Sequence, residues 1–256
     1  MVRRLCELSS KLLGGTEGVR LLVLLLVIVG CGLGFIALAD EILEQETQGF
    51  DEAVVRAMRR ADDPSMPIGP RWLRGAALDV TALGGVTVLT LVTLAVCGFL
   101  ALVRHFLSML LVLGSTMGGA VLNFSLKALF SRPRPAVVPH LAEASSASFP
   151  SGHAMLSAIV YLTLGVLLAQ LSESRWLKVY VLGVAVLLTF MVGLTRVFLG
   201  VHYLTDVLGG WMAGLAWALF TVVLARAARR RSPALREEMR HGGVPGSSVP
   251  PGERAG

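Results

Sequence analysis

The sequence contains little cysteine and no cluster of metal-binding residues. Its three cysteines, Cys6, Cys31 and Cys97, are scattered and have neither the spacing of a zinc site nor that of a disulfide framework. We therefore expect them to be small apolar fillers, and we expect no disulfide, no metal and no other cofactor. No internal repeat is visible in the sequence. Many transporters are built from repeats, so this observation argues against a transporter.

Charge is also scarce. Charged residues make up 16% of the 256 residues, hydrophobic residues make up 54%, and the mean hydropathy is +0.71. A helix of about 20 apolar residues spans a bilayer, and the apolar residues here occur in blocks of about that length. The six blocks are Val19–Leu38, Val86–Val103, Leu107–Phe130, Met155–Leu171, Val179–Thr195 and Leu208–Leu224. They predict an all-α integral membrane protein with six transmembrane helices.

The charge that is present is mostly positive. The net charge is +6 and the pI is about 9.8, values that also occur in nucleic-acid-binding proteins. Here the cations flank the first and last blocks, at Arg3, Arg4, Lys11 and Arg20, and at Arg226, Arg229, Arg230 and Arg231. Positive residues beside a span mark the cytoplasmic side. We therefore expect a multi-pass protein of the cell (inner) membrane, with both termini cytoplasmic, anionic lipids as contacts and no nucleic acid partner.

The chain divides into a membrane domain and two tails. An acidic stretch without a cleavage pattern follows the first block, so we expect that block to be an uncleaved span. The loop before the second block contains "FDEAVVRAMRR", in which Phe50, Val54 and Met58 share a helical face suited to the outer membrane surface. Trp72 suits an interfacial position, and Asp79–Thr81 is interpreted as a helix cap, with pocket lining as the alternative. The expected divisions are an N-terminal tail at 1–18, the membrane domain at 19–226 with its outer loop at 40–85, and a basic, disordered tail at 227–256.

Three short motifs carry chemistry. In "KALFSRPRP", Lys127 precedes Arg134 by seven residues, and prolines on both sides of Arg134 stiffen its backbone. Lysine supplies a point charge and arginine a planar fork that matches phosphate oxygens. A lysine that extends to the interface is the plain alternative for Lys127, but it does not explain the restrained Arg134.

The second motif, "FPSGHAML", opens the fourth block. Ser151 is a good N-cap, Gly152 permits close approach, and His153 lies in the first turn. The exposed amides of a helix N-terminus bind anions, although a cap with an incidental histidine would look the same.

The third motif, "TRVFLGVHYLTD", lies between the fifth and sixth blocks. Arg196 ends the fifth block, and His202 and Asp206 are four residues apart, which places them on one helical face. A carboxylate that bonds one ring nitrogen of a histidine leaves the other nitrogen as a base or nucleophile. A structural His–Asp pair is the alternative.

The order of the spans brings the three motifs together. With a cytoplasmic N-terminus, the third and fifth spans end outside and the fourth and sixth begin there. All three motifs then lie on one face of the membrane. We expect Lys127, Arg134 and Arg196, with the Ser151 and Gly152 amides, to form a cage for a phosphate group beside two histidines.

The motifs K-x6-R-P, P-S-G-H and (S/T)-R-x5-H-x3-D, in this order, resemble those of the type 2 phosphatidic acid phosphatase superfamily. Its relatives include bacterial membrane lipid phosphatases such as phosphatidylglycerophosphatases and undecaprenyl diphosphate phosphatases, glucose-6-phosphatase and the vanadium haloperoxidases. The resemblance implies a helical bundle of the acid phosphatase/vanadium haloperoxidase type. One departure is Thr195, where the family usually has serine; threonine keeps the hydroxyl for a phosphate contact.

The resemblance also implies roles by position. His202 attacks phosphorus and forms a phosphohistidine, Asp206 orients it, and His153 protonates the leaving oxygen and then activates water. The implied phosphate-binding residues are Lys127, Arg134, Ser151, Gly152, Thr195 and Arg196. Arg132 is outside the family motif, and we interpret it as an interface or headgroup contact.

The expected activity is metal-independent hydrolysis of a lipid phosphate or diphosphate at the outer face. Phosphatidylglycerophosphate, phosphatidic acid and a polyprenyl diphosphate all fit as substrates. A lipid phosphotransferase would use the same residues, and an anion transporter is a further alternative. The sequence does not indicate an oligomeric state.

Overall fold

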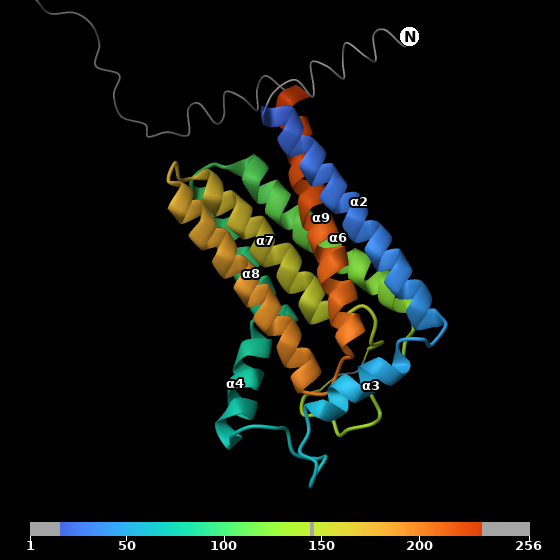
Figure 1. The fold of residues 1–256 in the computed structure, drawn as a ribbon. Coiled ribbons are helices and arrows are strands. Elements are labelled where there is room, and N and C mark those ends of the chain that lie inside the picture. Colours follow the sequence, from blue (N-terminus) through green and yellow to red (C-terminus); the bar gives the residue numbers. More distant parts are fainter. Residues whose placement is uncertain (1–15, 144–145, 232–256) are drawn as a thin grey trace, which may run out of the picture.

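The computed structural model describes residues 16–143 and 146–231, which form a bundle of helices (Figure 1). The tail predicted to be disordered lies almost entirely outside the described residues. The helices, in chain order, are α2 (Thr16–Leu43), α3 (Gln48–Ala57), α4 (Arg71–Ala82), α5 (Val86–Leu102), α6 (Phe106–Phe130), α7 (Gly152–Gln170), α8 (Arg175–Phe198) and α9 (Leu204–Arg231).

Helices α2, α6, α7, α8 and α9 are each long and apolar enough to cross a membrane. Helix α5 has 17 residues and is short for a span, but it follows α4 with a bend of 45°, and the two together can form a sixth crossing. The protein is therefore a multi-pass integral membrane protein built of helices, as the hydropathy predicted. The second predicted span, Val86–Val103, corresponds to α5, the second helix of this bent pair.

Three of the helices extend beyond their apolar blocks at the ends that carry the motifs. Helix α7 begins at Gly152 instead of Met155, α8 ends at Phe198 instead of Thr195, and α9 begins at Leu204 instead of Leu208. The added turns contain the polar motif residues, which lower the local hydropathy without breaking the helical hydrogen bonds. The motifs therefore lie on the ends of the helices and in the turns that follow them.

Helices α7 and α9 approach each other closely at the end that carries the motifs. A Cβ atom on Gly210 would lie 2.7 Å from the carbonyl oxygen of Ser151, and one on Gly214 would lie 2.7 Å from that of Met155. Small residues four apart let two membrane helices pack backbone against backbone. The Ser151 amide also donates to the Asp206 carbonyl at 2.9 Å, so the second and third motifs are joined through their main chains.

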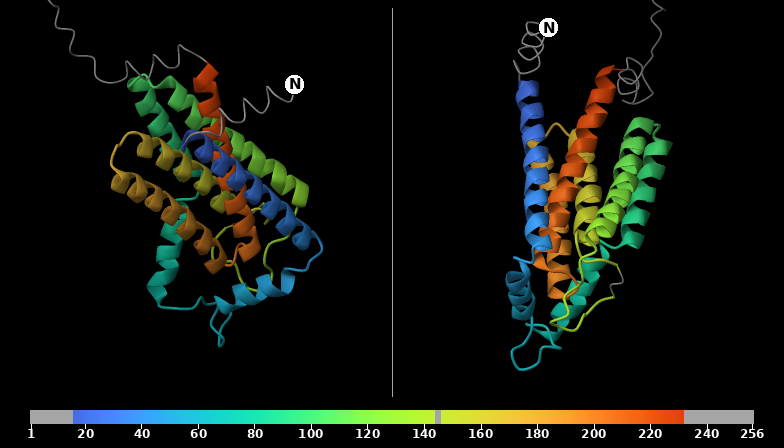
Figure 2. Two further views of the ribbon diagram at one scale, coloured as in Figure 1. Left: turned by 45° about the horizontal axis from the view of Figure 1, so that its top comes forward. Right: turned by 90° about the vertical axis from the view of Figure 1, so that its right-hand side faces the viewer.

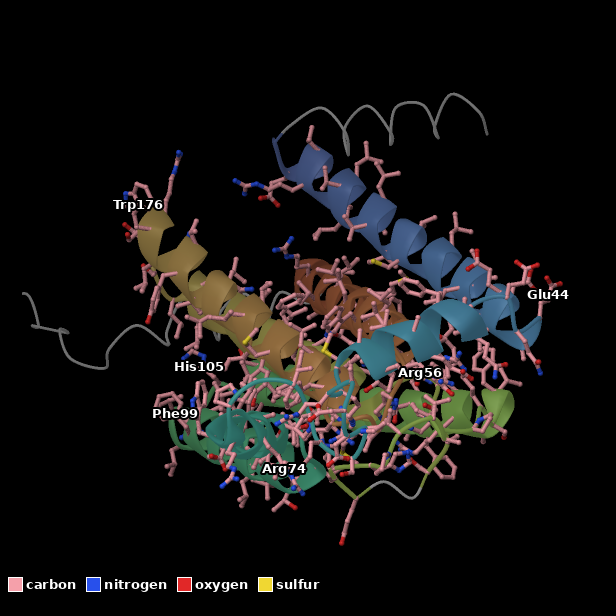
Figure 3. The ribbon with its side chains drawn as sticks, turned by 60° about the horizontal axis from the view of Figure 1, so that its bottom comes forward. Glu44, Arg56, Arg74, Phe99, His105 and Trp176 are labelled. Atoms are coloured by element: carbon pink, nitrogen blue, oxygen red, sulfur yellow. The ribbon has the colours of Figure 1, made fainter. Side chains whose placement is uncertain are left out.

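The two ends of the bundle differ. Helices α3 and α4 lie at one end with the loop after α6, whereas the start of α2 and the end of α9 lie at the other (Figures 1 and 2). The exposed Trp176 marks the start of α8 at the second end, away from Arg56 and Arg74 (Figure 3). Trp72 of α4, also exposed, belongs to the first end, so each end carries a tryptophan, as at the two interfaces of a membrane.

The loop between α2 and α5 contains the predicted surface helix, and one detail of that loop is different from the prediction. The predicted apolar face of this helix contained Phe50, Val54 and Met58. In the structure the residues of α3 that are buried against the protein are Asp51 and Val55, one position further along, and Phe50 is exposed. The interpretation of Asp79–Thr81 as a cap was wrong. Both residues lie inside α4, and the N-cap of α5 is Gly85.

Candidate active site

Four helix ends converge to form the site. They are the C-terminal ends of α6 and α8 and the N-terminal ends of α7 and α9. Gly200, at φ +73°, turns the chain between α8 and α9, and a side chain there would collide with Arg59. The turn places His202 two residues before α9, with its side chain buried.

The ring of His202 has partners on both sides. Nε2 lies 3.1 Å from Nη1 of Arg134, and Nδ1 lies 3.4 Å from Oδ2 of Asp206. A guanidinium can only donate, so Nε2 accepts and the ring proton is assigned to Nδ1, which faces the carboxylate. Burial lowers the pKa of His202 to about 4, against the opposing pull of Asp206, and the charge of Arg134 adds to the lowering. The histidine is thus neutral near pH 7, with the lone pair of Nε2 directed at a cation.

Asp206 is fully buried, and both of its carboxylate oxygens are occupied. Oδ1 accepts from Nη1 of Arg132 at 2.7 Å. Oδ2 accepts from the Tyr203 amide at 2.8 Å and from the hydroxyl of Ser148, and it faces His202. These bonds fix the plane of the carboxylate. Its position relative to the ring is therefore set before any substrate arrives.

Arg134 and Lys127 are held by carbonyl groups of the surrounding loops. Arg134 donates to the Val201 carbonyl at 2.6 Å and to the Ser146 carbonyl at 2.8 Å. Burial lowers the pKa of Arg134, although such a group stays charged near pH 7. Lys127 donates to the Ala147 carbonyl. Both cations are thus fixed by the segment between α6 and α7.

Arg196 is buried at the end of α8 and is not fully satisfied. Its Nη1 donates to the hydroxyl of Thr81 at 3.1 Å, and its Nε has no hydrogen-bond partner. A buried N–H without a partner is costly unless a ligand accepts from it. Thr81, in the stretch interpreted from sequence as a cap, thus positions this arginine, whereas Asp79 is exposed.

The start of α7 completes the arrangement. Ser151 caps the helix by accepting from the Ala154 amide, as predicted. The expectation that the Ser151 amide binds phosphate was wrong, because that amide donates to the Asp206 carbonyl. The Gly152 amide remains as the predicted donor at the open end of the helix. His153 lies close enough to Arg196, His202, Arg134 and Lys127 for their charges to act on it. The structure therefore brings together the residues of all three motifs.

Thr195 differs from the other predicted phosphate-binding residues. Its hydroxyl donates to the Val192 carbonyl at 2.6 Å within α8. A phosphate oxygen accepts hydrogen bonds, so Thr195 would have to give up this bond to serve it. Its predicted contact with phosphate stays a prediction.

Comparisons with known proteins agree with this geometry. A family model described as the PAP2 superfamily matches residues 106–230, which include the three motifs. Phosphatidylglycerophosphatase B of Bacillus subtilis is 36% identical over 190 residues, which are 72% of this chain and 87% of that protein. The chain belongs to the PAP2 superfamily. Human dolichyldiphosphatase 1, another relative, is 32% identical over 123 residues, 42% of this chain and 52% of that protein.

Solved structures support the PAP2 assignment. The crystal structure of a transmembrane PAP2-type phosphatidylglycerolphosphate phosphatase from Bacillus subtilis matches with a TM-score of 0.71 and 31% identity, over 80% of this chain and 98% of that one. LpxE of Aquifex aeolicus, at 24% identity and a TM-score of 0.52 over 68% of this chain and 95% of that one, shares the fold. The protein is a PAP2 membrane lipid phosphatase, and the resemblance inferred from the motifs is confirmed.

Sequence reasoning missed several neighbours of the PAP2 motifs. The interpretation of Arg132 as an interface or headgroup contact was wrong, because its side chain is nearly buried and bonds Asp51 and Asp206. Ser148 escaped notice as a positioning group, because its partner Asp206 is 58 residues away along the chain. Thr81 lay in the stretch for which pocket lining was the alternative, but its partner Arg196, 115 residues away, was not predicted. Arg132 lies in the quoted motif, but nothing in the sequence identified its partners.

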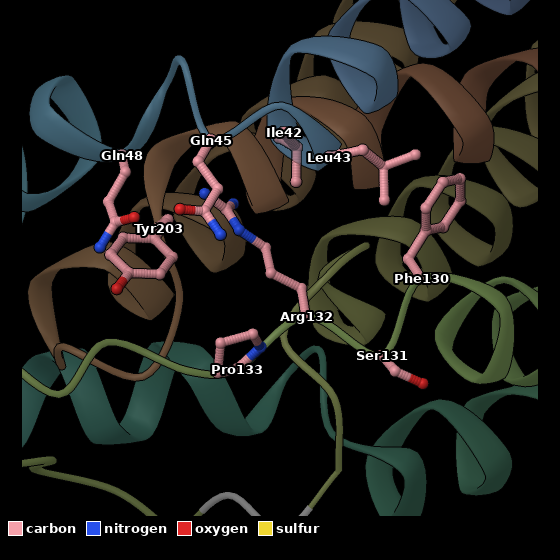
Figure 4. Close-up of a pocket in the computed structure, with 9 residues that line it drawn as sticks. All are labelled: Ile42, Leu43, Gln45, Gln48, Phe130, Ser131, Arg132, Pro133 and Tyr203. Atoms are coloured by element: carbon pink, nitrogen blue, oxygen red, sulfur yellow. The ribbon is translucent and has the colours of Figure 1, made fainter.

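A cavity of about 180 Å³ lies beside Arg132, as Figure 4 shows. It is lined by Ile42, Leu43, Gln45, Gln48, Phe130, Ser131, Arg132, Pro133 and Tyr203. None of the nine predicted site residues lines it. The cavity is therefore distinct from the cluster formed by the three motifs, although Arg132 borders it.

Proposed function

We propose that this PAP2 protein hydrolyses a lipid phosphate or diphosphate through a phosphohistidine on Nε2 of His202. The observation that carries the proposal is the state of that ring. Its proton is assigned to Nδ1, which faces Asp206, and its Nε2 lone pair is directed at Arg134. A neutral imidazole with one nitrogen anchored and the other beside a cation is suited to attack an anionic phosphorus centre.

The proposed reaction has two steps. In the first, Nε2 bonds to phosphorus, the bond from phosphorus to the lipid oxygen breaks, and His153 gives that oxygen its proton. In the second, His153 takes a proton from water, the water oxygen bonds to phosphorus, and the N–P bond breaks to release phosphate. The contribution of the protein is positioning and charge, which dominate phosphoryl transfer.

The cations are placed to stabilise the transferring group. Lys127, Arg134 and Arg196 act together with the Gly152 amide on the equatorial oxygens, and the partnerless Nε of Arg196 supports this role. Ser151 supports it as the cap of α7, and Thr195 is the remaining candidate. In residues 16–143 and 146–231 no group of three or more His, Cys, Asp or Glu side chains could hold a metal ion. We therefore propose that the cations act without a metal.

The substrate is a membrane lipid whose tail stays in the bilayer. The site lies at one end of the membrane helices, where a headgroup would meet it. The names of the two curated relatives point to phosphatidylglycerophosphate and to a polyprenyl diphosphate. We propose that both belong in the substrate class, with phosphatidic acid, and that the site faces the non-cytoplasmic side.

The test is release of inorganic phosphate from these three lipids by purified protein in detergent, with excess EDTA in a parallel series. We expect hydrolysis of at least one lipid, unchanged by EDTA. We expect His202→Ala to lower the rate by several orders of magnitude, about 10⁴-fold or more. A His202→Ala variant near the wild-type rate would refute the mechanism. An added alcohol that takes up the phosphoryl group in place of water would indicate a phosphotransferase instead.

A further inference from the structure

Two buried carboxylates from distant parts of the chain share one guanidinium. Arg132 donates from Nη2 to Oδ2 of Asp51 at 2.9 Å and from Nη1 to Oδ1 of Asp206 at 2.7 Å. Both aspartates are fully buried, and the arginine side chain is 11% exposed. Asp51 lies on α3, outside the membrane bundle, whereas Asp206 is the proposed partner of the nucleophile.

Asp51 also fixes the start of the helix that carries Asp206. Its Oδ1 accepts from the Thr205 amide at 3.1 Å, and its Oδ2 accepts from the Thr205 hydroxyl. That hydroxyl in turn accepts from Nη1 of Arg132 at 2.9 Å. Asp51 therefore acts as an N-cap for α9 that is supplied by another helix. The network joins α3, the loop after α6 and the first turn of α9.

The network holds the oxygen of Asp206 that does not face the histidine. Arg132 binds Oδ1, whereas Oδ2, which also accepts from the Tyr203 amide and the Ser148 hydroxyl, faces Nδ1 of His202. Three neighbours restrain Arg132: Asp206 accepts from its Nη1, Asp51 accepts from its Nη2, and the centre of the Tyr203 ring lies 4.5 Å from its guanidinium carbon. Figure 4 shows the side chain reaching from the loop toward the turn between α2 and α3, with Tyr203 beside it.

We propose that Asp51 and Arg132 are positioning residues that hold the Asp206 carboxylate toward His202. The proposal rests on the proposed function, because it concerns the orientation of the proposed nucleophile. It assigns to α3, a helix outside the family motifs, a part in the chemical step. A simple role in attaching α3 to the bundle would have a different signature, because it would affect folding and leave the rate of the folded protein intact.

The test measures kcat and KM for Asp51→Asn, which removes the charge and keeps the shape. We expect kcat to fall by about 10–100-fold, as when groups that orient catalytic ligands are removed. We expect KM to change by less than about twofold, because the loss falls on the chemical step. Glu52→Gln is the matched control: Glu52 lies on the same helix, and its carboxylate pairs with Arg56 at 3.2 Å and not with Arg132. This control should retain the wild-type kcat.

A double variant separates positioning from attachment. If Asp51 acts through Asp206, then Asp51→Asn combined with Asp206→Asn should be no slower than Asp206→Asn alone. Losses that multiply, or an Asp51→Asn variant with the wild-type kcat, would overturn the proposal. If Asp51→Asn does not elute as a single species, Arg132→Lys replaces it, because lysine keeps the charge but lacks the planar fork. The same kcat-selective loss is expected there, and a wild-type kcat would again overturn the proposal.

The two proposals fail in different ways. Substantial activity in His202→Ala would refute the proposed function whatever Asp51 does. An inactive His202→Ala together with an unaffected Asp51→Asn would refute the positioning role alone.

Discussion

The ring of His202, the proposed nucleophile, lies between a cation on one side and an anion on the other. A histidine next to a carboxylate is often protonated, because the negative charge favours the imidazolium. Here the ring is buried, and Arg134 and Arg196 add positive charge nearby, so the neutral form is favoured. The cations proposed to bind the phosphate thus also favour the neutral form of the proposed nucleophile. Binding and activation are therefore properties of one cluster.

This arrangement predicts a low acid limb in the pH profile. Because burial lowers the pKa of His202 to about 4, the ring stays neutral until the pH falls to that value. The acid limb of kcat/KM, which reports the free enzyme, should have an apparent pKa near 4 instead of the ordinary 6.5. The measurement is an initial-rate series from pH 8 to about 3, corrected for the second ionisation of the phosphate, which lies near 6.

Folding must be monitored in the same series. The unfolded chain takes up a proton on His202 near its ordinary pKa of 6.5, whereas the folded chain does so only near 4. The folded state therefore loses stability as the pH falls between these values. Rates count only where the protein remains folded. A limb at pH 6 to 7 that remains after both corrections would contradict the neutral, buried nucleophile.

Residues of the site divide into those that sequence reveals and those that it does not. Within a motif the partners are close along the chain, as His202 and Asp206 are. The prediction that both lie on one helical face was wrong, because α9 begins at Leu204 and the turn after Gly200 brings His202 to Asp206. Asp51 is 81 residues from Arg132 and 154 from Thr205, so only the folded bundle brings them together. The residues next to Asp51 in the sequence do not show that its side chain is buried. The buried face of α3 was therefore predicted from its apolar residues alone.

At the scale of helices, hydropathy located the membrane segments but not their ends. Five of the six predicted spans correspond to single helices long and apolar enough to cross a membrane, and the bent pair of α4 and α5 can supply the sixth. The ends were missed where polar residues continue a helix into the site, as at Gly152 and Leu204. The bend between α4 and α5 was missed because α4 is not apolar enough to be read as part of a span.

The turn between α8 and α9 can be tested through Gly200. Its φ of +73° lies in the left-handed region, and an added Cβ would lie 2.2 Å from Nη2 of Arg59 and 2.9 Å from Cγ2 of Val138. Arg59 donates to the Phe198 carbonyl at 2.8 Å at the end of α8, so the collision would also disturb that cap. We expect Gly200→Ala to destabilise the protein by about 1–3 kcal/mol from backbone strain.

The measurement is the melting temperature in detergent, with Gly183→Ala as the matched control. Gly183 lies on α8 and has no atom within 4 Å of its Cβ position, so alanine should be tolerated or slightly stabilising there. Because the turn positions His202, the Gly200 variant should also lose activity before it unfolds. Equal melting temperatures for the two variants would contradict the strain at Gly200.

At the scale of the whole molecule, the site and the two described ends of the chain lie at opposite ends of the bundle. The first described helix begins near Arg20 and the last ends beyond Arg226, both far from the site (Figure 1). The end with the site also carries arginines, of which Arg56 pairs with Glu52 and Arg60 with Asp62. The proposed orientation rests on an excess of lysine and arginine at the end of the bundle opposite the site. Lysine and arginine count toward orientation even when they are paired, so the arginines at the site end make that excess smaller.

Orientation therefore calls for a direct measurement with single cysteines. On a background with alanine at the three native cysteines, Ala61→Cys places a thiol in the exposed loop between α3 and α4, at the site end. Glu173→Cys places one in the exposed turn between α7 and α8, at the opposite end. In intact cells we expect a membrane-impermeant maleimide to label the first and not the second, because the proposed site faces away from the cytoplasm. Both should react once the membrane is permeabilised, and both variants should retain phosphatase activity, since neither residue contacts the site. The reverse labelling pattern would place His202 on the cytoplasmic side, and substrates presented only at the outer surface would then be ruled out.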